Sequence, residues 1–132
     1  MPVTRQNQFA LQMPRLWFTL AYALALVVGV LSLIPGPDIG SSDKLAHFLT
    51  YAILSASFSL IVERQKSLWL VLSGLIAYGL ILEFLQGLTG YRMEDMADAV
   101  ANSLGVITGL IFFFSPLHGI LRRFERWLIS RF

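Results

Sequence analysis

Strongly polar side chains interrupt three long apolar stretches of this sequence, and their types are those that carry out chemistry. Each stretch contributes two of them, namely His47 and Tyr51, Glu83 and Gln86, and Asp98 and Asn102. Such a side chain is costly inside a membrane span, so it usually faces a bundle interior or water and often marks a functional site. A histidine, a glutamate and an aspartate could together perform general acid–base chemistry, or could hold a hydrolytic metal ion with one position open for water.

The spacing of these residues places each pair on one face of a predicted helix. The three stripes are Lys44, His47, Tyr51 and Ser55; Gly79, Glu83, Gln86 and Gly90; and Asp98, Asn102, Gly105 and Gly109. Residues three or four positions apart share one face of a helix. The last stripe continues into a small-residue seam that allows close helix contact. We therefore expect Asp98 and Asn102 to face the bundle rather than lipid.

Four apolar stretches must position these residues, and each has about the length that a helix needs to cross a hydrocarbon core. They cover residues 16–34, 45–62, 68–88 and 96–114. The chain is 56% hydrophobic and 14% charged, with a mean hydropathy of +0.68, which excludes an ordinary soluble globule and a disordered chain. The absence of cysteine excludes a disulfide framework, a thiolate metal cluster and a cysteine nucleophile. The sequence predicts one all-α domain over residues 1–132, a polytopic four-helix membrane bundle.

Residue types at the ends of the apolar stretches indicate where the predicted helices begin and end. Pro35 and Gly36 end the first stretch, and the absence of a small-residue cleavage site there predicts a retained helix rather than a signal peptide. Gly90 is expected at the C-cap of the third helix. Asp95 is expected at the N-cap of the fourth.

Positive residues are divided unevenly between the two sides of such a bundle. Eight lie on the side of the termini and the 63–67 loop, namely Arg5, Arg15, Arg64, Lys66, Arg122, Arg123, Arg126 and Arg131. Lys44 and Arg92 lie on the other side. This bias predicts cytoplasmic N and C termini. Because the positive residues form no single open patch, the expected partner is the lipid bilayer and not nucleic acid.

This topology brings the polar residues of three helices to one depth. The second and fourth helices begin at the outer side, and the third ends there. Glu83 precedes Leu88 by five residues, which corresponds to about 7.5 Å along a helix. Four further polar residues lie just above this depth, namely Lys44, Arg92, Glu94 and Asp95. The sequence therefore predicts an outer-facing polar pocket near the leaflet boundary.

The C-terminal tail, residues 117–132, has the pattern of an amphipathic helix. Its apolar positions are Leu117, Ile120, Leu121, Phe124 and Leu128, and its basic positions are Arg122, Arg123, Arg126 and Arg131. We expect this helix to lie on the anionic inner leaflet, with Trp127 at the interface. Its role is either that of an anchor or that of a partner-binding helix.

Taken in order, these residues resemble the VanZ-like family. The pattern comprises an Asp-Lys-x-x-His opening at 43–47, Tyr51, a Glu-x-x-Gln at 83–86, Arg92, and an Asp-x-x-Asp-x-x-x-Asn-x-x-Gly at 95–105. The resemblance covers about residues 40–110. It implies a small protein of the bacterial inner membrane and cell envelope. The family takes its name from a member linked to low-level resistance to the lipoglycopeptide teicoplanin.

In this setting the polar residues suit an enzyme acting on the head group of a lipid-linked envelope glycan or a phospholipid-like molecule. Glu83 and Asp98 would serve as base and acid, and His47 as base or metal ligand. The candidate substrate-binding residues are Asp43, Lys44, Tyr51, Gln86, Arg92, Asp95 and Asn102. Among them Arg92 would clamp an anion, with Lys44 nearby. A divalent metal cofactor and the oligomeric state are left open.

The sequence leaves two other function classes open, and several of the polar residues also have a possible structural role. The same residues could form a non-enzymatic binder of an envelope lipid or lipoglycopeptide, whereas a small transporter is disfavoured by the apolar inner halves of the spans. The structural roles are a hydrogen-bond donor for His47, helix association for Glu83 and Gln86, N-caps for Asp43 and Asp95, charge neutralisation for Arg92, and packing for Tyr51. Since no sequential catalytic motif is present, any site must be assembled in space.

Overall fold

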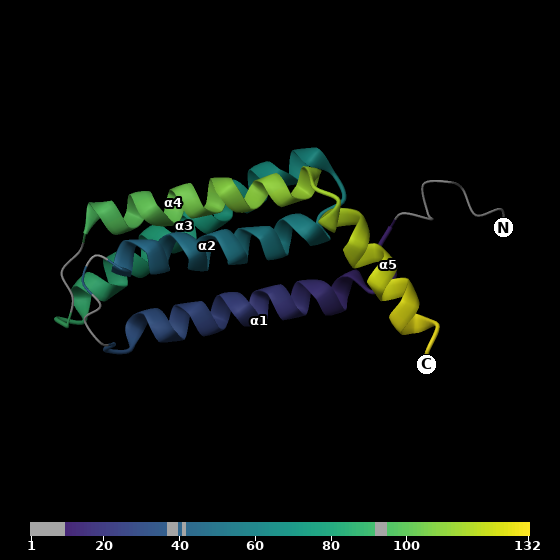
Figure 1. Ribbon diagram of the computed structural model, residues 1–132. Coiled ribbons are helices and arrows are strands. Elements are labelled where there is room, and N and C mark those ends of the chain that lie inside the picture. The colour runs from purple at the N-terminus through teal and green to yellow at the C-terminus, as the bar shows by residue number, and fades with distance from the viewer. Residues whose placement is uncertain (1–9, 37–39, 41, 92–94) are drawn as a thin grey trace.

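The computed structural model describes residues 10–36, 40, 42–91 and 95–132, and every secondary-structure element within them is a helix. The elements are α1 (Pro14–Leu33), α2 (Ser42–Ile61), η2 (Gln65–Ser67), α3 (Leu68–Leu88), α4 (Met96–Leu110), η3 (Ile111–Phe114) and α5 (Leu117–Ile129). Figure 1 shows α1 to α4 running alongside one another, with α5 across one end of the bundle. Four segments are long and apolar enough to cross a membrane: Pro14–Leu33, Ser42–Ile61, Gln65–Leu88 and Met96–Phe114. The predicted four-helix membrane bundle with an amphipathic C-terminal helix is therefore confirmed.

Local chemistry sets the ends of the helices. Ile34, which precedes Pro35, has extended backbone with φ −87° and ψ 138°, because a residue before proline disfavours the helical region. Gly90 follows α3 with a φ of +75°, the left-handed conformation that glycine supplies at a helix C-terminus. The Asp95 carboxylate accepts from the Ala97 amide at 2.9 Å and caps α4. Asp95 is thus confirmed as the N-cap of α4, and Gly90 ends α3 one residue after its C-cap, Thr89.

The bundle has two chemically different ends. We call the end at which α2 and α4 begin and α3 ends the polar end, and the opposite end, crossed by α5, the tail end (Figure 1). The positive residues of α1, of the α2–α3 connection, of α5 and of the residues that follow α5 belong to the tail end, namely Arg15, Arg64, Lys66, Arg122, Arg123, Arg126 and Arg131. Lys44 lies in the first turn of α2, at the polar end. Arg5, Arg92 and Glu94 lie outside the described residues. The charge bias of the sequence thus separates the two ends, and the cytoplasmic assignment of the tail end stays a prediction.

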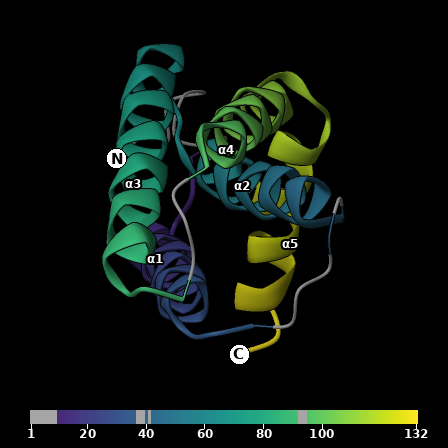
Figure 2. The same cartoon turned by 90° about the vertical axis from the view of Figure 1, so that its left-hand side faces the viewer.

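The most extensive contact in the bundle joins α2 and α4, which run parallel because both begin at the polar end. The end-on view of Figure 2 shows these two helices side by side. A Cβ added at Gly105 would overlap the Phe48 carbonyl oxygen, and one added at Gly109 would lie 2.5 Å from the Ala52 carbonyl oxygen. The predicted small-residue seam therefore holds the backbone of α4 directly against the backbone of α2.

The faces that meet inside the bundle are buried, and the outward faces are apolar. Leu54 and Val106 are 0% exposed, and the buried Ser55 hydroxyl donates to the Val106 carbonyl oxygen at 2.7 Å. Large apolar side chains on the outside remain more than half exposed, among them Leu26, Trp69, Leu70 and Val100. This distribution suits a bundle whose outer surface contacts lipid tails.

Helix α5 docks on the tail end through the buried carboxylate of Glu125, which is 1% exposed. It accepts from the backbone amides of Gln12 and Met13 at 2.5 and 3.0 Å and from Trp17 Nε1 at 2.6 Å. The amides at the start of a helix lack partners inside it, and the helix dipole favours negative charge there. Glu125 thus stabilises the beginning of α1 from the far end of the chain.

Arg122 departs from the expected pattern of the tail. The sequence grouped it with the basic face of the amphipathic helix, but it is only 5% exposed. Its Nη1 donates to the carbonyl oxygens of Leu60 and His118 at 3.0 and 2.7 Å. Docking on the bundle turns one side of α5 inward, so the helix has a bundle-facing side as well as an apolar and a basic one. Ile120, Phe124 and Trp127 remain exposed on its apolar side, and Arg123 and Arg126 on its basic side.

We predict that Gly105→Ala lowers the free energy of unfolding by about 1–3 kcal/mol, the usual cost of overpacking. The added methyl group meets the backbone of α2, which cannot rotate away as a side chain would. Gly74→Ala is the matched control, because a Cβ at that exposed position of α3 has no heavy atom within 4 Å. The measurement is the midpoint of thermal unfolding in mild detergent. Equal midpoints for the two variants would contradict the close contact between α2 and α4.

Candidate functional site

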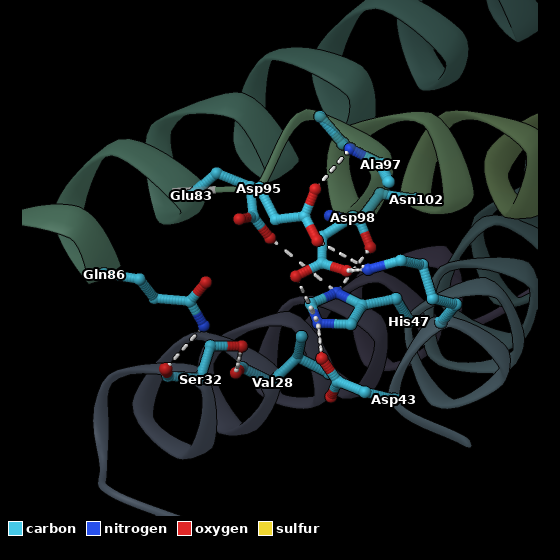
Figure 3. Close-up of polar contacts among 12 residues, drawn as sticks. Val28, Ser32, Asp43, His47, Glu83, Gln86, Asp95, Ala97, Asp98 and Asn102 are labelled. Atoms are coloured by element: carbon cyan, nitrogen blue, oxygen red, sulfur yellow. Dashed lines mark hydrogen bonds and ion pairs between the residues drawn. The ribbon is translucent and has the colours of Figure 1, made fainter. Parts of the chain in front are cut away.

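His47 lies at the centre of a polar cluster drawn from three helices (Figure 3). Its Nδ1 lies 2.9 Å from Asn102 Oδ1 and 3.7 Å from Glu83 Oε1. Its Nε2 lies 3.7 Å from Oδ2 of Asp98 and 3.7 Å from Oδ2 of Asp43. Helices α2, α3 and α4 therefore bring together the three residues for which the sequence suggested catalytic roles; the roles themselves stay predictions. We call His47, Glu83, Asp98, Asn102, Asp43, Lys44 and Gln86 the polar cluster.

Lys44 connects the first turns of α2 and α4. Its Nζ lies 2.7 Å from Asp98 Oδ1 and 2.7 Å from Asp95 Oδ2. The side chain of Asp98 is 4% exposed, so Lys44 provides the opposite charge that a buried carboxylate requires. The Lys44 ammonium, helped by the Ala97 amide, holds the pKa of Asp95 below its usual range, which keeps Asp95 ionised at neutral pH. Lys44 thus engages two acids of α4.

Asp43 and Tyr51 belong to the same stripe of α2 as His47. The sequence suggests an N-cap role for Asp43, but α2 begins at Ser42 and Asp43 lies within its first turn. Tyr51 is 3% exposed, and a Cβ added at Gly79 of α3 would lie 3.2 Å from its ring. Tyr51 therefore fills the space between α2 and α3, which agrees with its packing role and leaves a binding role as a prediction.

Gln86 extends the cluster toward α1. Its Nε2 donates to the Ser32 carbonyl oxygen at 2.7 Å. Because a carbonyl oxygen can only accept, this contact fixes the orientation of the amide. Gln86 Oε1 is buried and has no hydrogen-bond partner among the described residues. In Figure 3 this oxygen is turned toward the cluster. A buried acceptor without a donor costs about 1–3 kcal/mol, so the position favours a ligand that supplies a donor.

Carboxylates outnumber cationic side chains in the described part of the cluster. The carboxylates of Asp43, Glu83 and Asp98 accompany Lys44 and the His47 ring, while the amides of Gln86 and Asn102 each add an acceptor oxygen and a donor NH2 group. The predicted anion clamp, Arg92, lies outside the described residues. Without it, the described residues suit a cation or a hydroxyl-rich group better than a bare anion.

Sequence reasoning missed Ser32. Its contact with Gln86 is made by the backbone carbonyl, while its hydroxyl donates to the Val28 carbonyl oxygen at 2.7 Å. A backbone acceptor has no signature in the residue type, so no signal in the sequence could have identified it. The glutamine was found because a strongly polar residue in an apolar stretch stands out on its own.

Comparison with known proteins places this geometry in a family. A family model described as VanZ/LLP1 matches residues 3–121. The chain belongs to the VanZ/LLP1 family. The matched range contains the whole polar cluster and ends within α5. The predicted resemblance to VanZ-like proteins is therefore confirmed.

A curated relative comes from the fission yeast Schizosaccharomyces pombe (strain 972 / ATCC 24843), where it is described as an uncharacterised protein. It is 29% identical to this chain over 92 residues, which make up 67% of this chain and 56% of the relative. The chain thus spans little more than half the length of the curated relative that it matches. No solved structure matches this chain.

We predict that Lys44→Met lowers the free energy of unfolding by about 1–3 kcal/mol, because it leaves the buried Asp98 carboxylate without its ammonium partner. Lys66→Met removes an exposed lysine of η2 and is the matched control, with no measurable change expected. Adding Asp98→Asn to Lys44→Met removes the buried charge and restores most of the loss. The stability of all three variants is measured by thermal unfolding in detergent. A Lys44→Met variant as stable as the control would show that the ion pair does not hold α2 against α4.

Proposed function

We propose that this VanZ/LLP1 protein binds the head group of a lipid-linked glycan or a phospholipid-like molecule at the polar end of the bundle. In this proposal the polar end faces the outer leaflet of a bacterial inner membrane, and both termini are cytoplasmic. A link to glycopeptide (teicoplanin) resistance would follow if the bound head group is an envelope component that the antibiotic also meets.

The observation that carries the proposal is the buried Oε1 of Gln86, which has no hydrogen-bond partner among the described residues and belongs to the same face of α3 as Glu83. Gln86 is 3% exposed and Glu83 is 8% exposed. Two acceptors at this depth favour a ligand rich in hydroxyl or ammonium donors, and sugar and phospholipid head groups are such ligands. A bound donor would remove the cost of the unpaired oxygen at Gln86.

The surface around the cluster supports a ligand with a lipid tail. Leu45, Phe84, Leu88 and Met96 belong to the first turn or the last two turns of their helices at the polar end and are 58%, 58%, 68% and 76% exposed. Apolar side chains this close to the buried polar groups would lie against acyl or isoprenoid chains while the head group meets the cluster. A wholly water-soluble ligand would gain nothing from that surface.

The placement of His47 favours processing of the head group as a second function. One ring nitrogen faces Glu83 and the other faces Asp98, at 3.7 Å in each case. A histidine between two carboxylates can assist cleavage or transfer, either by exchanging a proton with Glu83 or Asp98 or by holding a metal ion. Asn102 would orient the ring, and Asp95 and Tyr51 would border the bound group.

A transporter is supported less well than a binding protein or an enzyme. Toward the tail end, the buried polar side chains of the described spans are the hydroxyls of Ser55 and Ser59. A polar pathway through the membrane requires ionisable or hydrogen-bonding groups along its whole length. The described residues concentrate these groups at one end instead.

We predict that the protein, purified from bacterial membranes in mild detergent, retains one lipid class in excess of its abundance in the bulk membrane. Glu83→Gln should reduce the retained amount by about 10–100-fold, because a hydrogen bond to a charged group contributes about 1.5–3 kcal/mol. Ser73→Ala, at an exposed position on the same helix, is the matched control and retains the lipid. Mass spectrometry of the extracted lipids gives both the class and the amount. No enrichment, or equal loss in both variants, would refute head-group binding at the cluster.

The same preparation separates an enzyme from a binder. If the wild type converts the retained lipid and Asp98→Asn retains it unconverted, the protein is an enzyme. If the wild type retains the lipid and releases no product over prolonged incubation, it is a binding protein.

A further inference from the structure

We propose that His47, Asp43 and Asp98 form a binding site for a divalent cation at the polar end. The inference deepens the proposed function, on whose location it rests, by naming an ion that would meet the head group. One atom from each residue can be chosen so that the three atoms all lie within 4.8 Å of one another. Metal–ligand bonds of about 2.0–2.2 Å bring the ligand atoms of one ion within about 4.4 Å of each other, so small side-chain adjustments complete the set.

The hydrogen bond to Asn102 prepares His47 as a ligand. Asn102 Oδ1 accepts from Nδ1 at 2.9 Å, which places the ring proton on Nδ1 and directs the lone pair of Nε2 away from Asn102. Metal-binding histidines usually carry a partner of this kind on the nitrogen that does not bind the ion. Asn102 is 3% exposed, so this contact lies inside the bundle and constrains the ring.

The carboxylates on the other side of the ring are arranged for a shared ion and not for a direct hydrogen bond. Asp43 Oδ2 and Asp98 Oδ2 each lie 3.7 Å from Nε2, beyond the range of about 2.7–3.2 Å for a hydrogen bond. Both oxygens are close enough to Nε2 for one ion to bind all three atoms. A divalent cation there would place its positive charge beside two carboxylates.

Asp98 divides its two oxygens between two partners. Oδ1 accepts from Lys44 at 2.7 Å, whereas Oδ2 is turned to His47. Lys44 therefore fixes the carboxylate as Asn102 fixes the imidazole, and each ligand has an outer partner. One nitrogen and two oxygens are a ligand set suited to Mn²⁺, Fe²⁺ or Zn²⁺, with remaining positions for water or for an oxygen of the head group.

An independent observation, made outside the three ligands, also indicates a bound group. Gln86 comes from α3 and is 3% exposed, and its Oε1, which has no partner in the described part of the chain, is turned toward the cluster (Figure 3). An acceptor at this position requires a donor, and water bound to a cation is a strong donor. The acceptor and the three ligand atoms thus favour the same occupant, a hydrated cation.

The test is Mn²⁺ binding to the full chain, purified in detergent with a tag that lacks histidine and freed of metal with a chelator. Pulsed electron paramagnetic resonance detects the ¹⁴N nucleus of a histidine bound directly to Mn²⁺. The chain has two histidines, and His118 lies at the tail end with its Nε2 2.8 Å from the Val62 carbonyl oxygen. His118→Gln is therefore a matched control for His47→Gln.

We expect bound Mn²⁺ with a ¹⁴N signal in the wild type and in His118→Gln, and no ¹⁴N signal in His47→Gln. Asn102→Leu, which removes the positioning contact and leaves the three ligands in place, should weaken Mn²⁺ binding by about 10–100-fold. A folded wild type that binds no Mn²⁺, or a ¹⁴N signal that persists in His47→Gln, would overturn the proposal. The experiment contains no lipid, so its failure is distinct from a failure to retain lipid, which would instead overturn the proposed function.

Discussion

The direct contact between the backbones of α2 and α4 is the constraint on which the rest of this structure depends. Gly105 and Gly109 leave no room for a side chain against α2, so the two parallel helices can meet only in one register. Polar partners across the contact are 51 to 55 positions apart along its whole length. This fixed register sets Lys44 opposite Asp98 and His47 opposite Asn102. The geometry of the polar cluster therefore depends on the small-residue seam at Gly105 and Gly109, which follows the cluster along α4.

Charge burial is the second constraint, and both ends of the bundle satisfy it by pairing distant parts of the chain. At the polar end, Lys44 of α2 compensates Asp98 of α4. At the tail end, Glu125 of α5 accepts the amides that precede α1. A buried charge without such partners would cost several kcal/mol. The two ends differ in how far their buried acceptors are paired. Glu125 accepts from three donors of the chain itself, whereas Gln86 Oε1 has no donor among the described residues.

Much of this architecture could be predicted from residue pattern. The four apolar stretches gave the helices, since length and hydropathy determine what a bilayer accepts. Polar residues spaced three and four positions apart predicted the polar faces, and Gly105 and Gly109 predicted the seam of close helix contact. Periodicity identifies a face but not the helix that it meets, so the pairing of the parallel helices α2 and α4, and with it the Lys44–Asp98 contact, could not be derived. The docking of α5 on the bundle could not be predicted either, for a related reason. Arg122 has the charge of a solvated residue, and its partners are backbone carbonyl oxygens, which no sequence pattern marks.

The central claim of this account is that the polar cluster faces the outer leaflet while the arginine-rich tail end faces the cytoplasm. The chain has no cysteine, so a single introduced thiol reports its own side of the membrane. Ser42 begins α2 at the polar end and Ser130 follows α5 at the tail end, and both are exposed. In intact bacterial cells, a membrane-impermeant maleimide should label Ser42→Cys at once, and Ser130→Cys only after permeabilisation. The reverse pattern would place the cluster in the cytoplasm and contradict the binding of an outer-leaflet head group.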